Sequence, residues 1–383
     1  MTTDKVTSRE RLLIAMQNGQ ADRVPCTPDL SCMIPCRMTG KPYWDCLLFS
    51  HPPHWQAYLD AADYFGIDAW FWGSLDFTYN DGVTVDSAVV SRENDRILNR
   101  WTMHTPAGDL WQERLYYRDN PDTLVRRWIK DLENERSLLP YVFRVPDGYR
   151  TETLKEQRTA IGERHAIGAG VGFPGVNWWC TDTIDGGLEA VSYLLYDAPE
   201  LIDELYRHHY AAAIRQVELI IDSGEFDYLT LGGSGSITLA SPDLFDRFAL
   251  PFIREATRLC KQAGLPTMLH SCGKERHLVE RVATTTDLNC VNPLEIPPMG
   301  DCDLAEIKSL YGHKIALMGN LHTTETMLRG TVEEVKSAAH KAIDDAGQDG
   351  GFILSTGDQC GRDTPDENIF ALVEVCETYG RYD

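Results

Sequence analysis

Positive charge is scarce in this sequence: 36 lysines and arginines stand against 58 aspartates and glutamates, for a formal net charge of −22. Nucleic acids and anionic membrane surfaces are polyanions, and a protein that binds them needs a positive face to displace their condensed counterions. The charge balance therefore argues against both, and we expect no nucleic-acid partner and no membrane partner.

Long apolar runs are also missing. No uninterrupted stretch reaches about 18 apolar residues, which is roughly the minimum for a membrane-spanning helix. The opening residues, Met1-Thr2-Thr3-Asp4, run into a polar helix signal without the charged and apolar regions of a secretory signal. The 11 cysteines are odd in number and irregularly spaced, so they do not resemble a disulfide framework. We therefore expect a cytoplasmic protein with reduced thiols.

What the sequence does contain is an alternation of short β-type runs with longer helical stretches. Eight runs fit strands that end in turn residues, at 23–26, 68–73, 166–172, 227–231, 267–270, 288–291, 315–318 and 352–355. Alternating strands and helices predict a parallel sheet, and eight such units favour a closed (β/α)8 TIM barrel. An open doubly wound sheet is the alternative, but no Gly-x-Gly-x-x-Gly turn opens a helix after the first strand.

Two additions to the barrel are predicted. An amphipathic helix over about 8–17 forms an N-terminal helical extension, and alternating residues broken by turns over about 87–117 predict an inserted antiparallel β meander. The composition is globular, with 43% hydrophobic and 25% charged residues. A barrel with insertions fills most of a chain this long, so we expect one domain over residues 1–383.

Two strand ends carry candidate metal ligands. His270 and Cys272 are two residues apart at the end of the fifth strand, and on an extended segment such residues point to the same side. Cys360 follows the eighth strand, and in a barrel both strand ends lie at the C-terminal rim. A His/Cys/Cys set with one open position is typical of a catalytic zinc site.

Each of these residues also has a plain structural interpretation. A histidine two positions before a cysteine is often a packed polar pair, and a lone cysteine such as Cys360 is often a small buried apolar residue. The ligand interpretation is favoured because all three residues follow strands at the same end of the barrel, beside glycines that let loops approach closely. The other cysteines lie within helical or strand patterns, or have no histidine at ligand spacing.

Several motifs, spread over nearly the whole chain, together resemble the uroporphyrinogen decarboxylase superfamily. They are Asp22-Arg23-Val24-Pro25, Ser241-Pro242-x-x-Phe245, Leu250-Pro251, His270-Ser271-Cys272-Gly273, Asn292-Pro293-Leu294-Glu295, Leu317-Met318-Gly319-Asn320 and Thr364-Pro365-x-x-Asn368. The resemblance implies a barrel and two possible activities. One is metal-free decarboxylation of a porphyrinogen. The other is zinc-dependent, corrinoid-linked methyl transfer, as in methylcobalamin:coenzyme M methyltransferases and O-demethylase components, where it implies His270, Cys272 and Cys360 as the zinc ligands.

The segment after the first strand favours methyl transfer. Decarboxylases of the superfamily meet a substrate with several carboxylates through an arginine-rich segment, but residues 26–37 contain only Arg37. We therefore expect a Zn²⁺-dependent methyltransferase. Uroporphyrinogen decarboxylase and a non-catalytic zinc-dependent binding protein are the alternatives. No Asp-x-His-x-x-Gly cobalamin-ligand motif is present, so the resemblance implies that a separate corrinoid protein supplies the cobalamin.

The direction of methyl transfer is left open by the ligand set. Zinc with two thiolates and one imidazole is a mild Lewis acid, which can hold a thiol as a nucleophilic thiolate or polarise a heteroatom so that Co(I) attacks its methyl group. Trp70, Trp72 and Trp178 follow early strands and are expected to lie near the barrel mouth, where they would line a pocket for a methoxylated aromatic, with ordinary packing as the alternative. We favour the demethylating enzyme over a coenzyme M-type thiol methyltransferase.

Two further polar residues follow the sixth and seventh strands. Glu295 is a candidate catalytic residue that closes the zinc sphere in the resting enzyme, or else salt-bridges a neighbouring loop. Asn320 is expected to hydrogen-bond a substrate oxygen, or else to cap the following helix.

Overall fold

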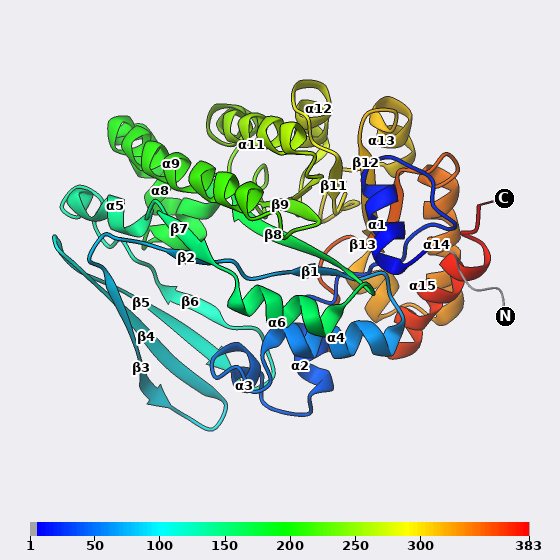
Figure 1. Ribbon diagram of the computed structural model, residues 1–383, viewed down its shortest axis with the longest axis horizontal. Coiled ribbons are helices and arrows are strands. Elements are labelled where there is room, and N and C mark those ends of the chain that lie inside the picture. The colour runs from blue at the N-terminus through cyan, green and yellow to red at the C-terminus, as the bar shows by residue number, and fades with distance from the viewer. Residues whose placement is uncertain (1–5, 383) are drawn as a thin grey trace.

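A curved parallel sheet forms the centre of the computed structural model, which describes residues 6–382 (Figure 1). The segment at residues 1–5, on which the expectation about an export signal depends, lies outside the described part. The sheet has the order β1-β8-β9-β10-β11-β12-β13. These strands are Trp70–Trp72, Ala166–Gly172, Tyr228–Gly232, Thr267–His270, Cys290–Asn292, Ala316–Leu321 and Phe352–Thr356. All neighbouring pairs are parallel.

The sheet is closed by the short segment 23–26, which lies between β13 and β1. Cys26 forms a parallel bridge with Leu354, whose backbone N–H donates to the carbonyl oxygen of Pro25 over 2.9 Å. On the other side, the Asp68 N–H donates to the Cys26 carbonyl over 2.7 Å. Proline lacks an N–H, which limits the ladder here to a single bridge. The predicted (β/α)8 barrel is confirmed, with this segment as its first strand.

Helices surround the barrel (Figure 1). The longer ones are α4 (His54–Phe65), α6 (Glu152–Ile161), α8 (Gly187–Asp197), α9 (Pro199–Ser223), α11 (Leu250–Ala263), α12 (Arg276–Thr285), α13 (Leu304–Tyr311), α14 (Val332–Ala346) and α15 (Asp366–Thr378). Shorter ones are α2 (Met33–Met38), α3 (Tyr43–Leu47), α5 (Leu139–Val142), α7 (Val176–Trp178) and α10 (Pro242–Leu244). Among the described residues, no helix combines the length and apolarity needed to cross a membrane.

Alternate residues of strand β8 point to opposite faces of the sheet and belong to two different hydrophobic cores. Ile167, Ala169 and Val171 are buried in the core between the sheet and its helices, whereas Ala166 belongs to a second core inside the barrel. Helix α1 (Ser8–Met16) contributes Leu12 and Met16 to that inner core. The predicted N-terminal helix therefore closes one end of the barrel and leaves the other end for the site.

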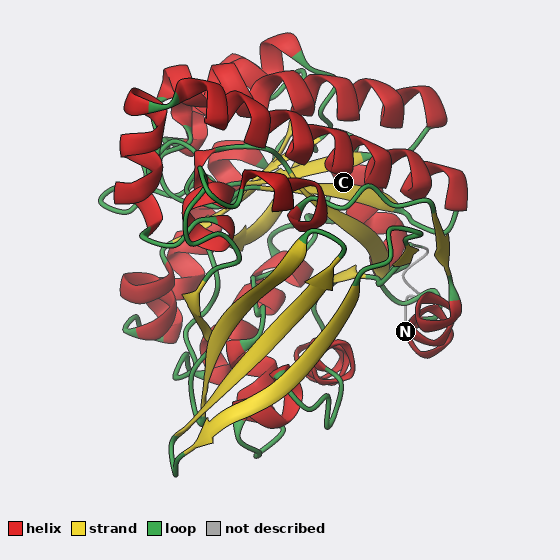
Figure 2. Ribbon diagram, turned by 90° about the vertical axis from the view of Figure 1, so that its left-hand side faces the viewer, coloured by secondary structure: helices red, strands yellow, loops and turns green. Residues whose placement is uncertain are grey.

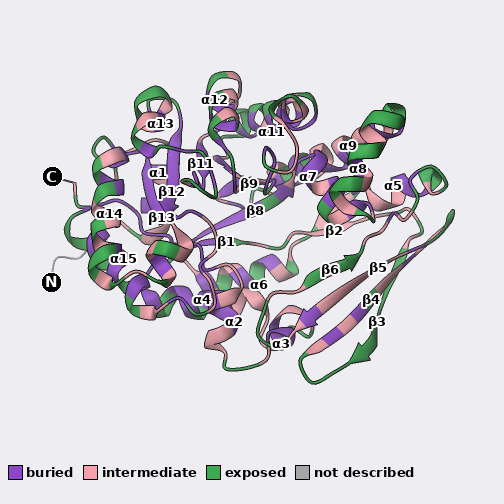
Figure 3. Ribbon diagram, turned by 180° about the vertical axis from the view of Figure 1, so that it is seen from behind, coloured by how far each residue is buried: buried purple, intermediate pink, exposed green. Residues whose placement is uncertain are grey.

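The inserted sheet is present and larger than the sequence predicts. It consists of the antiparallel strands β3 (Thr84–Arg92), β4 (Arg96–Thr105), β5 (Gly108–Tyr117) and β6 (Thr123–Arg126), against an expected meander over 87–117. Strands β2 (Asp76–Thr78) and β7 (Gly148–Arg150) pair at its base. Figure 2 shows the sheet beside the barrel. In Figure 3, β3 is exposed along its length, so the insertion packs through its other strands.

Candidate metal centre

His270, Cys272 and Asp358 form a group of three potential metal ligands at the C-terminal rim. Their ligand atoms all lie within 4.8 Å of one another, and each side chain is partly buried. His270 ends β10 and Cys272 follows two residues later, while Asp358 lies just beyond β13. The parallel sheet thus brings side chains from two distant segments to one point. The sequence predicts a common direction for His270 and Cys272, but it assigns the contribution of the second segment to Cys360 and not to Asp358.

A neighbouring strand orients the His270 ring. Asn292 ends β11 and is the register partner of His270. The two residues interact through Nδ1 of the imidazole and Oδ1 of the amide, which are 2.6 Å apart. Since Oδ1 can only accept, Nδ1 carries the proton, and the Nε2 lone pair is left for a metal ion. Asn292 therefore selects the tautomer that metal binding requires.

Acidic groups crowd around these ligands. Burial, reinforced by the nearby Asp358 carboxylate, raises the pKa of the Cys272 thiol to about 12. Burial and the same carboxylate raise the pKa of Glu295 and of Asp29. Acids that repel one another in a buried site are stabilised by a divalent cation at their centre. A thiolate, an imidazole and a carboxylate are all zinc ligands, so the residues present fit a zinc ion.

Cys360 is not part of this group within the described residues. Its side chain is fully buried, and its Sγ lies 3.9 Å from Oγ1 of Thr356. The turn is held by Gln359, whose Oε1 accepts the backbone N–H groups of Cys32 and Met33 over 3.2 and 3.1 Å. The structure therefore brings together two of the three predicted ligands, with Asp358 beside them, and ligation by Cys360 stays a prediction.

Glu295 and Asn320 both lie near the metal ligands. Glu295 is 8% exposed, and its Oε2 accepts the backbone N–H of Gly273, directly after the His-x-Cys segment. Asn320 is also 8% exposed and lines a small cleft with Glu295 and Gly357. The turn after β12 is capped by His322, whose Nδ1 accepts from two backbone N–H groups. The capping alternative for Asn320 is therefore wrong, and its substrate-binding role stays a prediction.

The three predicted substrate-lining tryptophans lie at different depths. Trp70 is buried in the inner core with Leu12 and Met16 of α1. The expectation that it lies at the mouth is thus corrected: two residues of β1 are about 7 Å long, which places Trp70 one layer deeper than Trp72. Trp72 is 57% exposed and packs edge-on against Trp70. Trp178 donates its indole N–H to the Gly232 carbonyl over 3.0 Å.

Glycines leave open space on β8 and β9, the two strands that precede β10 in the sheet order. Gly170 of β8 and Gly232 of β9 lie on neighbouring strands, and Gly232 pairs with His270 in register. In the described structure, a Cβ at either glycine would meet no atom within 4 Å. The rim therefore has room for a reactant beside the candidate metal ligands.

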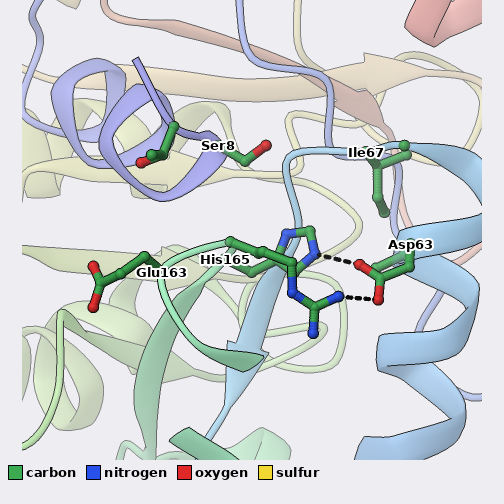
Figure 4. A pocket seen from close by; sticks show the side chains of 9 residues that line it. Ser8, Asp63, Ile67, Glu163 and His165 are labelled. Carbon is green, nitrogen blue, oxygen red and sulfur yellow. Dashed lines mark hydrogen bonds and ion pairs between the residues drawn. The ribbon is translucent and has the colours of Figure 1, made fainter. Parts of the chain in front are cut away.

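A cavity of about 440 Å³ lies at the opposite end of the barrel (Figure 4). Its lining includes residues that precede β1 and β8, namely Asp63, Ile67, Glu163 and His165. The Asp63 carboxylate accepts from His165 Nε2 over 3.2 Å and also pairs with Arg164. The hydrogen bond to His165 and the ion pair with Arg164 tie α4 to the start of β8, and they lie far along the strands from the metal ligands.

Two residues of this site, Asp358 and Asn292, have no predicted role from the sequence. Asp358 follows Gly357 in the turn that carries Cys360, and its carboxylate was the available signal. Asn292 lies in the Asn-Pro-Leu-Glu motif at the end of a strand next to the His270 strand. Parallel pairing of these two strands would have indicated the contact between their last residues.

The fold and the site together define the class of this protein: it is a (β/α)8 barrel with candidate metal ligands at its C-terminal rim. The model of the uroporphyrinogen decarboxylase (URO-D) family matches residues 151–379, which is more than half of the chain. The protein belongs to this family. The matched region begins after the inserted sheet, so β3 to β6 lie outside it.

The similar proteins include both decarboxylases and methyltransferases. Uroporphyrinogen decarboxylase 2 of Arabidopsis thaliana is 26% identical over 236 residues, covering 60% of this chain and 56% of the relative. A methylcobamide:CoM methyltransferase of Methanosarcina barkeri is 28% identical over 169 residues, covering 44% and 46%. The matches thus span about half the length of these relatives.

The fold recurs in a solved structure over nearly its full length. A methyltransferase from Methanosarcina mazei aligns with a TM-score of 0.66, covering 98% of this chain and 99% of that chain. The sequence identity is 18%, so the likeness establishes a shared fold.

Proposed function

We propose that this protein is a zinc-dependent methyltransferase that moves a methyl group between a small substrate and the cobalt of a corrinoid carried by a separate protein. The observation that carries the proposal is the convergence of His270, Cys272 and Asp358 within 4.8 Å at the open rim. Relatives named as methylcobamide:CoM methyltransferases support it. The cytoplasmic location and the corrinoid partner remain predictions.

Zinc held by these side chains would act as a Lewis acid on an oxygen or sulfur atom of the substrate. His270, Cys272 and Asp358 would leave one position of a tetrahedral site for that atom, or for Glu295 in the resting enzyme. Asn292 keeps the His270 ring in the binding tautomer. Asn320 is available to hydrogen-bond a second substrate oxygen, because its amide has no hydrogen-bond partner in the described structure.

In the direction that we favour, the substrate is a methyl ether. The corrinoid, delivered as a second substrate by its own protein, would supply Co(I) as the two-electron nucleophile for the methyl carbon and would leave carrying the methyl group as methyl-Co(III). The carbon–oxygen bond breaks, its electrons stay on the oxygen, and a solvent proton then gives the alcohol. Thiol methylation by a coenzyme M-type enzyme uses the same ligand set, with a thiol as acceptor and methyl-Co(III) as donor.

The contacts of Arg37, the only arginine of segment 26–37, argue against porphyrinogen decarboxylation. Arg37 donates to the Thr364 carbonyl over 3.0 Å and pairs with Asp366. Its guanidinium is therefore engaged inside the protein, and the segment offers no second guanidinium for substrate carboxylates. Decarboxylation would also leave the group of His270, Cys272 and Asp358 at the rim without a role.

The proposal is tested by mixing the zinc-loaded protein with cob(I)alamin and 2-methoxyphenol and following the cobalt absorption spectrum. Conversion to methylcobalamin is expected with zinc-loaded protein, and not with zinc-free protein or with Cys272→Ala. A parallel reaction of methylcobalamin with coenzyme M tests the reverse direction. If neither reaction exceeds the rate without protein, and the protein decarboxylates uroporphyrinogen instead, the proposal is wrong.

A further inference from the structure

A second cavity, of about 420 Å³, lies between the inserted sheet and the barrel. One side is formed by Gln112 and Arg114 of β5 together with Trp128, and the other by Trp178 and by residues of α9. Gly172, the last residue of β8, also lines it. This volume falls within the range of about 300–1,000 Å³ that is typical of small-molecule sites.

Aromatic rings make up much of the cavity lining. Tyr79, Trp128, Phe143 and Trp178 all contribute to it. Phe143 stacks on His209, with 4.5 Å between ring centroids and 19° between the planes. Flat apolar surfaces of this kind favour a flat ligand, because offset and edge-on ring contacts add to the gain from burial.

Hydrogen-bonding groups without partners complete the lining. His209 Nδ1 accepts the indole N–H of Trp179 over 3.3 Å, so the proton of the neutral imidazole is on Nε2 as a donor. Burial lowers the pKa of His209 to about 3, which keeps the ring neutral. In the described part of the chain, the side-chain amides of Gln112 and Gln216 make no hydrogen bond. A ligand with oxygen substituents would satisfy these groups.

Charge in the cavity selects against an anionic ligand. Arg144 forms a bidentate pair with Asp81, at 2.6 and 2.7 Å, and stacks on Tyr79. Arg114 pairs with Asp122. Both guanidinium charges of the lining are therefore neutralised, and Asp182 adds a negative charge. A neutral ligand fits this balance better than a carboxylate or a phosphate.

The cavity lies close to the candidate metal centre. Gly172 pairs with Gly232, and Gly232 pairs with His270, so two strand spacings of about 4.8 Å separate the Gly172 and His270 backbones. Trp178 bridges the first of these two spacings, since its ring lies against Gly172 and its indole N–H reaches the Gly232 carbonyl. A ligand under the inserted sheet would approach the metal from the side and leave the mouth free for a second reactant.

We propose that this cavity binds the ring of a neutral, oxygen-substituted aromatic molecule. We assign it as the site for the ring of the methyl-bearing substrate, and only this second assignment rests on the proposed function. Much of the lining comes from the inserted sheet and its flanking segments, at residues that precede the region matched by the family. The insertion would then determine substrate choice in this protein.

The test measures binding of 2-methoxyphenol to the zinc-free, full-length protein by titration calorimetry. Gln216→Leu and Trp128→Leu are expected to weaken binding about tenfold or more, since they remove a hydrogen-bonding group and an aromatic wall. Trp111→Leu is the matched control, because its ring is covered by Arg100 and Lys130 and does not line the cavity. Trp111→Leu and Cys272→Ala are expected to bind like the unchanged protein.

Ligand analogues test the same site without a mutation. 2-Methoxycyclohexanol, which is not flat, and 2-methoxybenzoate, which is anionic, are each expected to bind about tenfold more weakly than 2-methoxyphenol. Absence of binding, or equal binding of all three molecules, would overturn the proposal. So would binding that Cys272→Ala abolishes and both cavity variants retain.

Failure of the proposed function gives a different result. Cavity-dependent binding without methyl transfer to any corrinoid supports the binding site and counts only against the proposed reaction. If methyl transfer does occur, Gln216→Leu is expected to raise KM about tenfold with little change in kcat, because it removes binding remote from the reacting atoms. An unchanged KM would overturn the substrate assignment.

Discussion

Asn292 holds the His270 imidazole through a contact of 2.6 Å between Oδ1 and Nδ1, at the matched ends of two paired strands. The backbone register fixes the distance between the two residues, and the amide oxygen fixes the tautomer. The orientation of a metal-binding ring is thus built into the sheet and does not depend on a mobile loop.

Replacing Asn292 by Ala is expected to lower zinc affinity about 10- to 100-fold, the usual effect of removing a partner of a histidine ligand. Competition with a chromophoric chelator measures this. Asn289→Ala is the matched control, because Asn289 bridges the other ends of the same strands through Thr267. Equal zinc affinity in the two variants would contradict the assigned role of Asn292.

Replacing zinc by Co(II) tests whether Asp358 or Cys360 is the third metal ligand. Each thiolate bound to Co(II) contributes a sulfur-to-metal charge-transfer band, so the band intensity counts the sulfur ligands. With Asp358 as third ligand, Cys360→Ala is expected to leave the band and the affinity unchanged, while Asp358→Ala weakens binding by about tenfold or more. Loss of about half of the band in Cys360→Ala would show instead that both cysteines bind the metal.

Asp68 joins the closing segment of the barrel to α1. Its fully buried carboxylate pairs with Arg11 at 2.7 Å and Arg23 at 2.9 Å, and also accepts the Cys26 N–H. Asp68→Asn is expected to lower the free energy of unfolding by about 3–5 kcal/mol, because it leaves buried charge uncompensated. Urea denaturation measures the change. Glu255→Gln, which breaks a solvent-exposed pair with Arg258, should cost less than about 1 kcal/mol.

Gly170 tests the open space at the rim. Gly170→Val is expected to change the free energy of unfolding by less than about 0.5 kcal/mol, because its side chain would enter unoccupied space. It should nevertheless abolish methyl transfer by filling the place of the reactant. Gly168→Val is the contrasting variant, since its Cβ would overlap the Tyr228 ring and cost about 1–3 kcal/mol. Full activity in Gly170→Val would show that the reactant lies elsewhere.

His209 makes stability depend on pH. Burial lowers its pKa from 6.5 to about 3, so between these values the unfolded chain binds a proton that the native protein does not. Stability therefore falls as the pH drops below about 6.5, by about 2 kcal/mol from this group at pH 5. His209→Asn keeps an acceptor for Trp179 but does not titrate, and should remove this part of the acid destabilisation. Urea unfolding at pH 7.5 and at pH 5 measures the change. If the free energy of unfolding falls as much in His209→Asn as in the unchanged protein, this prediction is wrong.

The sequence alone determined the barrel and half of the candidate site. Strand periodicity and turn residues located eight strands, because these signals depend on neighbouring residues along the chain. The spacing of His270 and Cys272 likewise fixed their common direction, since alternate residues of an extended segment share a side.

Tertiary structure decided the rest. Asp358 and Cys360 lie in an irregular turn, where no period dictates direction, and the anchoring of Gln359 on the start of α2 decides which of them lies with His270. Trp70 and Trp72 have the same local pattern, and only the packing of α1 into one end of the barrel buries the first and leaves the second exposed. Contacts between segments far apart in the chain have no local signal, because they depend on how the whole sheet closes.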